Sequence, residues 1–210
     1  DIIPTTILII HNNKKEKKLQ NIVQLTVFPL LAERMDTKFD VFETLLKTLE
    51  KNNVSLEDGD VLVISTKYIS NSQGRIVNLE KIITSEEGKK VSKAYELKSE
   101  IAEIIIRESD KIFGGIGGFV ITSSDNIMAP NAGIDKSNAK KGMAILYPTN
   151  PYLVAEEIRR KIFLKFFIHV GIILVDSRLM PARIGTSGVA VSCAGIEPVL
   201  DMRAKNDLDG

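Results

Sequence analysis

The sequence is nearly free of cysteine: Cys193 is the one thiol among 210 residues, so no disulfide can form within the chain. It ends a mostly apolar run, residues 189–193, in which a thiol is expected to be buried and unreactive. A chain without disulfides suits a reducing compartment. We therefore expect a cytoplasmic protein without a nucleophilic cysteine.

Long apolar runs and a surplus of either charge are also missing. The nearest candidate for a membrane span, residues 162–175, is interrupted by Lys165 and His169, so we expect no membrane partner. Residues 2–10 lack the basic leader and the cleavage site of a secretory signal. With 28 Lys and Arg against 27 Asp and Glu, the net charge of +1 does not suggest a nucleic-acid partner.

Two common phosphate-binding loops are absent as well. Residues 65–75 lack the glycine spacing and the Gly-Lys-Ser/Thr end of a Walker A loop. The run Gly-Gly-Ile-Gly-Gly at 114–118 follows a helix and precedes a strand, the reverse of a dinucleotide-binding loop, so we interpret it as a turn. Residues 65–75 do carry hydroxyls, a lysine and an arginine, which suit phosphate oxygens, although an ordinary polar loop has a similar composition.

Helix signals are clear in three places. The spacing of Val41, Leu45 and Leu49 predicts a helix over residues 40–52, with Asp40 as its N-cap. Caps and apolar stripes predict one long helix over residues 85–109 and another over residues 150–166.

Strand signals alternate with these helices. Apolar runs predict strands at residues 61–64 and 170–175, and hairpin-like neighbours at 119–127 and 143–147 favour a mixed sheet over a parallel one. The expected fold class is α/β (α+β), a mixed β-sheet core with flanking helices. Residues 1–210 would form one domain, or two lobes that share one core, after an N-terminal extension of about 20 residues.

Two aspartates stand out in this framework. Asp135 lies in the tight polar stretch Asn-Ala-Gly-Ile-Asp-Lys-Ser-Asn at 131–138, between two apolar runs. Asp176 follows the predicted strand 170–175, and the carboxyl end of a buried strand is where open α/β folds place ligand and metal contacts. We interpret the two carboxylates as one hard-cation site. From the residues alone, the alternative is that Asp135 caps a turn and Asp176 ends a strand.

Four segments form a set that is specific in content and in order. They are Glu-Asp-Gly-Asp-Val-Leu-Val at 57–63, Ile-Ser and Gly-Arg within 69–75, the stretch 131–138, and residues 170–188 with an Asp-Ser pair. Together they resemble the coenzyme F-420-0:L-glutamate ligase family, the γ-glutamyl ligases of deazaflavin biosynthesis. The resemblance extends over residues 23–210 and favours the cation site over the turn.

The resemblance implies a γ-glutamyl-ligase-like fold, a homodimer and a specific reaction. GTP would phosphorylate the terminal carboxylate of the deazaflavin precursor F-420-0, and the amine of L-glutamate would displace the phosphate to give an amide. The implied cofactor is Mg²⁺ or Mn²⁺, because hard cations held by oxygen ligands can bridge phosphates and neutralise their charge.

The family's site residues can be carried over by position. Asp135 and Asp176 match metal-binding aspartates, and Ser177 stands where the family has a threonine ligand. Asn138 stands where an asparagine contacts the nucleotide.

The sequence also departs from the family pattern. The nucleotide-binding segment usually carries Ser-Thr and then Lys, and the aligned positions here are Thr66, Lys67 and Asn71, so one nucleotide-contacting lysine is lost or moved. The family's Asp-Thr-Asn-Gly-Arg run is Asp-Ser-Arg-Leu-Met at 176–180, which indicates a divergent branch. A further acidic metal ligand is expected beyond residue 210. The alternatives are a ligase for another carboxylate acceptor and a non-catalytic nucleotide- or deazaflavin-binding protein.

Arg183 is predicted to contact an anionic phosphate or carboxylate as a catalytic residue, because related ligases carry arginine at this position. A planar guanidinium can make two parallel hydrogen bonds to such a group, and lysine cannot. Arg183→Lys should therefore slow turnover or weaken nucleotide use by about one to three orders of magnitude. Steady-state rates at saturating and at limiting GTP test this, and unchanged values at both would contradict it.

Overall fold

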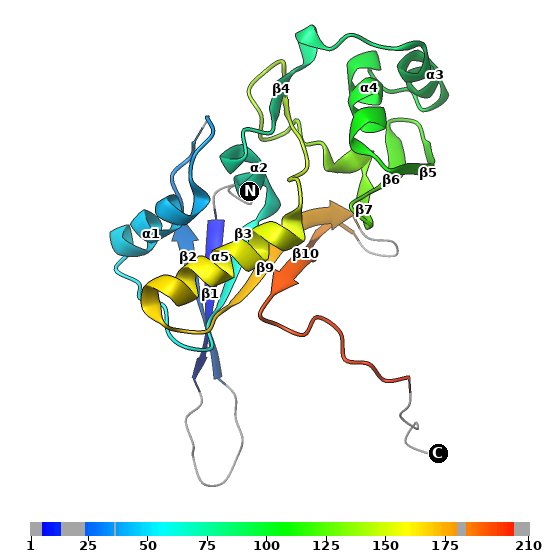
Figure 1. Cartoon of the computed structure of the whole chain (residues 1–210). Coiled ribbons are helices and arrows are strands. Elements are labelled where there is room, and N and C mark those ends of the chain that lie inside the picture. Colours follow the sequence, from blue (N-terminus) through cyan, green and yellow to red (C-terminus); the bar gives the residue numbers. More distant parts are fainter. Residues whose placement is uncertain (1–5, 14–23, 36, 180–183, 204–210) are drawn as a thin grey trace.

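The computed structural model describes residues 6–13, 24–35, 37–179 and 184–203 (Figure 1). In chain order, with η for a short 3-10 helix, the elements are β1 (Thr6–Asn13), β2 (Gln24–Leu31), α1 (Val41–Lys51), β3 (Val61–Ser65), α2 (Thr66–Ser72), β4 (Ile76–Asn78), η1 (Leu79–Lys81), α3 (Glu86–Ala94), α4 (Ser99–Glu108), β5 (Lys111–Ile116), β6 (Phe119–Ser124), β7 (Ile127–Pro130), η2 (Asn131–Gly133), β8 (Met143–Ile145), α5 (Pro151–Phe166), β9 (Gly171–Leu179) and β10 (Thr186–Ala194). The α/β class expected from the sequence is confirmed.

The largest sheet has five strands in the order β10-β9-β3-β1-β2. β3 and β9 are parallel, whereas the other neighbouring pairs are antiparallel, so the predicted mixed sheet is confirmed. β1, from the region expected as an N-terminal extension, lies inside this sheet. β2 lies at its edge, where Pro29 is tolerated because an edge strand can do without one backbone N–H.

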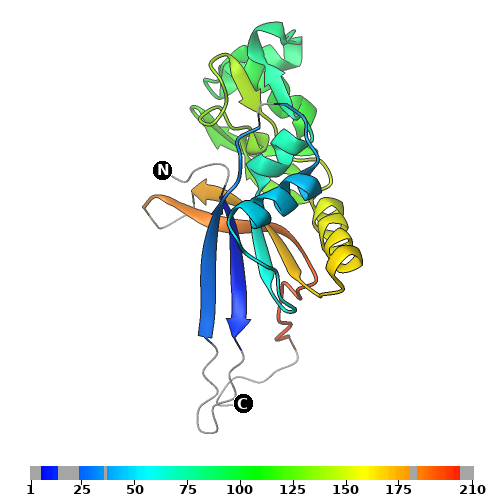
Figure 2. The ribbon, with the colours of Figure 1, turned by 90° about the vertical axis from the view of Figure 1, so that its left-hand side faces the viewer.

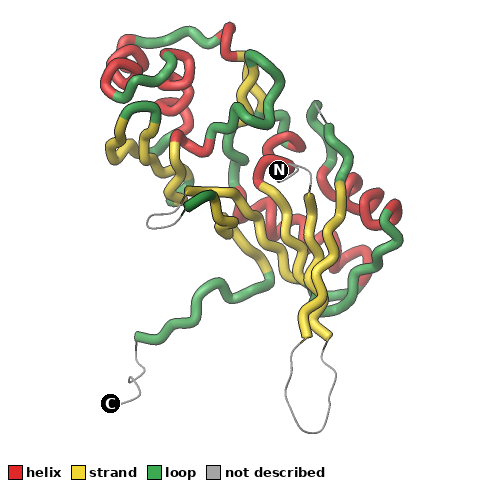
Figure 3. Tube along the Cα trace, turned by 180° about the vertical axis from the view of Figure 1, so that it is seen from behind, coloured by secondary structure: helices red, strands yellow, loops and turns green. Residues whose placement is uncertain are grey.

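The main core lies between one face of this sheet and the helices α1, α2 and α5. Figure 2 shows these helices to one side of the strands, and Figure 3 shows the strands from the opposite side. Every second strand residue faces the helices, as the two-residue period of a strand requires. The buried strand residues are Ile7 and Ile9 of β1, Leu62 and Ile64 of β3, and Ile172 and Leu174 of β9. Full burial of such a side chain contributes about 1.5–3 kcal/mol.

The predicted helices α1 and α5 are confirmed. The Asp40 carboxylate accepts hydrogen bonds from the backbone N–H groups of Phe42 (2.8 Å) and Glu43 (3.0 Å), which caps α1. Pro151 is the first residue of α5, where the missing N–H costs nothing. In the part of the chain that the structure describes, no helix could cross a lipid bilayer.

A smaller lobe holds α3, α4 and the antiparallel sheet β5-β6-β7, at the upper right of Figure 1. The β6–β7 turn is made by Asp125 and Asn126 with φ of 50° and 61°, the pairing that a type I′ hairpin turn requires. Residues 117 and 118 of the glycine-rich run form the predicted turn between β5 and β6, whereas residues 114–116 belong to β5. Ile101, Ile105 and Ala132 form a separate small core.

The single helix predicted over residues 85–109 is wrong, because the chain forms two helices, α3 and α4. Glu96 takes a φ of 50°, a left-handed conformation that a continuing α-helix cannot contain. The two helices then pack side by side, and Gly88 allows their close approach. A Cβ atom at Gly88 would lie 2.5 Å from a Glu103 carboxylate oxygen.

Glu103 joins the two helices through a shielded carboxylate. It accepts hydrogen bonds from Ser85 Oγ (2.6 Å), Ser85 N (2.8 Å) and Arg107 Nε (2.9 Å). The hydrogen bonds from Ser85, with the help of Arg107, hold the pKa of Glu103 below its ordinary value of 4.5 and outweigh the opposing effect of burial.

We expect Glu103→Gln to reduce the dependence of the free energy of unfolding on pH in the acidic range. Because the folded-state pKa is lowered, the stabilisation by Glu103 is complete above about pH 4.5 and is lost as the pH falls through the folded-state pKa. Urea unfolding over a pH series measures this dependence. Glu87→Gln, an exposed position in the first turn of α3, is the control. The same acid slope in wild type and Glu103→Gln would contradict the assignment.

Candidate functional site

The candidate site lies where β3 ends beside β9. The parallel register pairs Ser65 with Val175, so the residues that follow these two positions come together. Lys67 Nζ lies 3.1 Å from Asp176 Oδ1, although the two residues are 109 positions apart in the sequence.

The polar loop expected over residues 65–75 is wrong, because residues 66–72 form helix α2. Ser65 Oγ accepts a hydrogen bond from Lys67 N at 3.3 Å and caps this helix. Tyr68 and Ile69 are buried in the main core, which holds the segment in helical form despite its many polar residues.

The strand predicted over residues 170–175 extends further than expected. β9 continues to Leu179 and pairs with β10, which begins at Thr186. Because side chains alternate along a strand, Asp176 and Arg178 share one face. Ser177 is exposed on the other face, and its backbone N–H donates to Asp176 Oδ1 at 2.9 Å. The predicted catalytic residue Arg183 lies outside the described residues.

Asp135 follows an unusual left-handed turn. Asn131, Ala132 and Gly133 have φ values of 47°, 54° and 69°. Asn131 Oδ1 accepts from Val120 N (2.8 Å), and the Ala132 N–H donates to Thr122 Oγ1 (3.0 Å), so β6 holds the turn in place. Asn and Gly tolerate positive φ better than other residues, which gives Asn131 and Gly133 a structural cause.

The Asp135 carboxylate is fixed by its own loop. It accepts hydrogen bonds from Ser137 N (2.8 Å), Ser137 Oγ (2.6 Å) and Asn138 Nδ2 (2.7 Å). Its backbone also pairs with Ile145 at the end of β8. Burial opposes ionisation, but these hydrogen bonds and the charge of Lys67 prevail, so the pKa of Asp135 lies below its ordinary value.

The carboxylates of Asp135 and Asp176 therefore meet at the ammonium group of Lys67. Lys67 Nζ lies 3.1 Å from Asp176 Oδ1 and 3.5 Å from Asp135 Oδ2. The side chains of Asp135 and Asp176 are only 12% and 11% exposed, so water screens this charge cluster weakly. The structure thus brings Asp135, Asp176, Lys67 and Asn138 together.

Thr66 and Asn71 lie beside this cluster on α2. Thr66 is buried at the start of the helix, directly before Lys67. Asn71 is one helical turn beyond Lys67, and its buried Oδ1 has no hydrogen-bond partner among the described residues. Their predicted contacts with a nucleotide stay predictions.

Comparison with known proteins places this site in a family. Residues 30–210 match the family model described as F420-0:Gamma-glutamyl ligase. The chain belongs to this family. Among its relatives are proteins named coenzyme F420:L-glutamate ligase from Methanocaldococcus jannaschii, 35% identical over 74% of this chain, and from Methanopyrus kandleri and Archaeoglobus fulgidus, each 32% identical over 79% of it. The matched region covers 62–66% of the length of these relatives.

Arg178 is a site residue that the sequence interpretation missed in this γ-glutamyl ligase family member. Its Nε lies 3.7 Å from Asp176 Oδ2, and its Nη2 donates to the buried Tyr147 hydroxyl at 3.2 Å. Its Nη1 donates to the backbone oxygen of Met128 on β7. The spacing of Asp176 and Arg178, two apart on a strand, was the available signal.

The donor set of the cluster fits a small divalent cation. Carboxylate oxygens are the ligands that Mg²⁺ and Mn²⁺ prefer, and Mg²⁺ in phosphate-transfer sites is commonly held by one or two carboxylates together with water and substrate phosphates. Asp135 and Asp176 supply two such carboxylates directed at one point. Within the described ranges, no group of three or more His, Cys, Asp or Glu residues could hold a metal.

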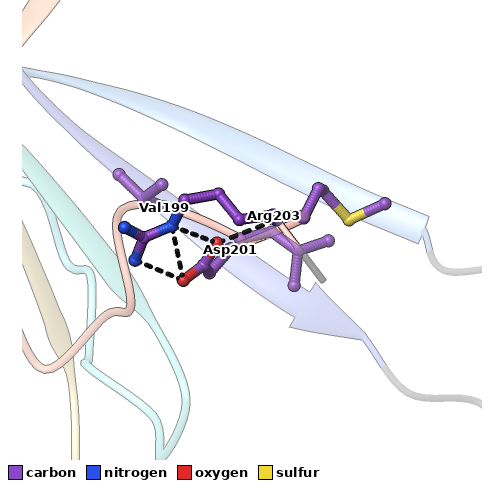
Figure 4. Close-up of a pocket in the computed structure, with 5 residues that line it drawn as sticks. Val199, Asp201 and Arg203 are labelled. Carbon is purple, nitrogen blue, oxygen red and sulfur yellow. Dashed lines mark hydrogen bonds and ion pairs between the residues drawn. The ribbon is translucent and has the colours of Figure 1, made fainter. Parts of the chain in front are cut away.

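A separate hollow near the described end of the chain has no part in this site. Its lining consists of five consecutive residues, 199–203, in which Arg203 forms hydrogen bonds with the Asp201 carboxylate (Figure 4). None of the predicted site residues lines it.

The left-handed turn makes Gly133 a sensitive position. A Cβ atom there would lie 2.3 Å from Tyr147 Cδ2, in addition to requiring a φ of 69°. Gly133→Ala should therefore lower the free energy of unfolding by about 2–4 kcal/mol. Gly118→Ala is the matched control, because Gly118 has a φ of 77° but nothing within 4 Å of an added Cβ. Equal losses in both variants, measured by urea unfolding, would disprove the steric argument.

Proposed function

We propose that this chain carries the site of a nucleotide- and divalent-metal-dependent amide ligase that adds L-glutamate to the carboxylate of F-420-0. The single observation that carries the proposal is the convergence of the Asp135 and Asp176 carboxylates on the Lys67 ammonium, whose nitrogen lies 3.5 and 3.1 Å from their respective oxygens. Two fixed carboxylates that meet beside a helix with unpaired polar groups suit the binding of a metal and a nucleotide phosphate. GTP is the proposed co-substrate and a homodimer the proposed assembly.

The proposed reaction has two steps. A carboxylate oxygen of F-420-0 attacks the γ-phosphorus of GTP, the bond from this phosphorus to the β–γ bridging oxygen breaks, and GDP leaves. The amine of L-glutamate then attacks the acyl carbon, loses a proton and displaces inorganic phosphate, which leaves an amide. An acyl phosphate is needed because a free carboxylate is a poor acceptor for an amine.

The residues of the chain position and neutralise these groups. Asp135 and Asp176 would hold the divalent ion, which supplies positive charge to the phosphate oxygens when bound. Ser137 and Asn138 fix the Asp135 carboxylate, so little reorganisation accompanies binding. Lys67 and Asn71 would face the nucleotide from α2. Arg183 keeps the phosphate-binding role that the family resemblance implies. The metal-binding role implied for Ser177 stays a prediction, because its side chain lies on the face of β9 opposite to Asp176.

Asp135→Asn and Asp176→Asn should each lower ligase turnover by at least about two orders of magnitude, because each removes a charged ligand of the proposed metal. Turnover is measured as glutamate incorporated into F-420-0 with GTP and Mn²⁺ or Mg²⁺, and circular dichroism verifies that the variants fold. Asp125→Asn is the control, since Asp125 is exposed and Asn also tolerates its φ of 50°.

Retained ligation in both aspartate variants would overturn the proposal. Binding of GTP or of the deazaflavin by the wild-type chain without any turnover would instead indicate a non-catalytic binding protein. Turnover with another carboxylate and not with F-420-0 would indicate a ligase for a different acceptor.

A further inference from the structure

Lys67 occupies the position between the two carboxylates where a metal would have to lie. Its ammonium is within 3.5 Å of oxygens from both Asp135 and Asp176. Its side chain is 21% exposed, so it remains in contact with solvent. A nucleotide-binding lysine was predicted here, but not one inserted between the metal-binding aspartates.

An ammonium and a divalent ion cannot share this position. Both are drawn to the same two oxygens, and two positive charges a few ångströms apart in a weakly screened site repel each other strongly. A lysine ammonium is a compact charge on a flexible stem of four carbons, so it can move while the backbone of α2 stays fixed. Binding of a metal therefore has to be coupled to a displacement of Lys67.

A second acceptor lies within the same helix. Asn71 follows Lys67 by four residues, and residues four apart lie on the same face of a helix. Helical side chains point back toward the N-terminus, which directs Asn71 toward the turn of Lys67. Its Oδ1 is buried and has no hydrogen-bond partner among the described residues. A buried acceptor of this kind is costly until it receives a donor.

We propose that Lys67 is an exchangeable counter-ion, which balances part of the negative charge of the Asp135–Asp176 pair when no metal is bound and moves to Asn71 Oδ1 when a divalent ion takes its place. This inference rests on the proposed metal site. The free energy needed to displace the ammonium lowers the observed affinity for the metal below the intrinsic affinity of the two carboxylates. The hydrogen bond to Asn71 offsets part of this free energy.

The test is Mn²⁺ binding to the whole chain without nucleotide. Binding is measured by titration calorimetry or by the free-ion signal in electron paramagnetic resonance. Lys67→Met keeps the length of the side chain and removes its charge, so it should bind Mn²⁺ about ten- to hundredfold more tightly than wild type, the effect of losing one competing charge-assisted contact. Lys67→Gln, should the Met variant not fold, is expected to change in the same direction.

Two further variants make the measurement specific. Lys136→Met removes the same charge from an exposed lysine next to Asp135 and should leave the affinity within about twofold of wild type, because exposed charges are screened. Asn71→Ala should weaken Mn²⁺ binding in the wild-type background and have no effect in the Lys67→Met background, since only the displaced ammonium needs Asn71.

The outcomes separate the two proposals. Equal or weaker Mn²⁺ binding by Lys67→Met, while Asp135→Asn still abolishes binding, would overturn the exchange and leave the metal site intact. An effect of Asn71→Ala that persists in the Lys67→Met background would overturn the transfer to Asn71. Wild-type binding that is absent, or that Asp135→Asn does not change, would overturn the metal site and the exchange with it.

Discussion

The parallel pairing of β3 with β9 is the constraint on which the rest of the structure depends. It places Ser65 beside Val175, so that the helix after β3 and the acid after position 175 meet at the same edge of the sheet. The chain between β3 and β9 contains the whole smaller lobe. The Asp135 loop follows this lobe, and the pairing of Asp135 with Ile145 of β8 holds the loop at this edge. Lys67, Asp135 and Asp176 therefore come from three different parts of the fold, and the pairing of β3 with β9 joins them.

Much of the framework could be predicted from the sequence because local signals and tertiary structure agree there. Asp40 and Pro151 mark the beginnings of α1 and α5, and the apolar run after Asp60 becomes β3. The two aspartates were recognised because their segments carry specific residue patterns at the ends of apolar runs. The rule that ligands collect at the carboxyl ends of strands pointed to Asp176, and the family resemblance favoured a shared site with Asp135.

The rest of the site could not be predicted because long-range packing overrides local composition. α2 contains Ser, Thr, Asn and Lys, as loops do, and it becomes a helix because Tyr68 and Ile69 enter the core. β9 extends past Asp176 because β10 is available to pair with it. The charge of Lys67 could be recognised from the sequence, but its insertion between Asp135 and Asp176 depends on the register of strands that are far apart along the chain.

The separation of 109 residues between Lys67 and Asp176 also sets the order in which the site can be made during protein synthesis. A nascent chain that has emerged only as far as α5 already holds Lys67 and Asp135, but it has no β9 and no second carboxylate. Contacts between segments so distant in sequence form late, since the loop between them must close first. An incomplete chain thus has Lys67 and one of the two carboxylates, and the second carboxylate that a divalent ion requires reaches the site only when β9 pairs with β3.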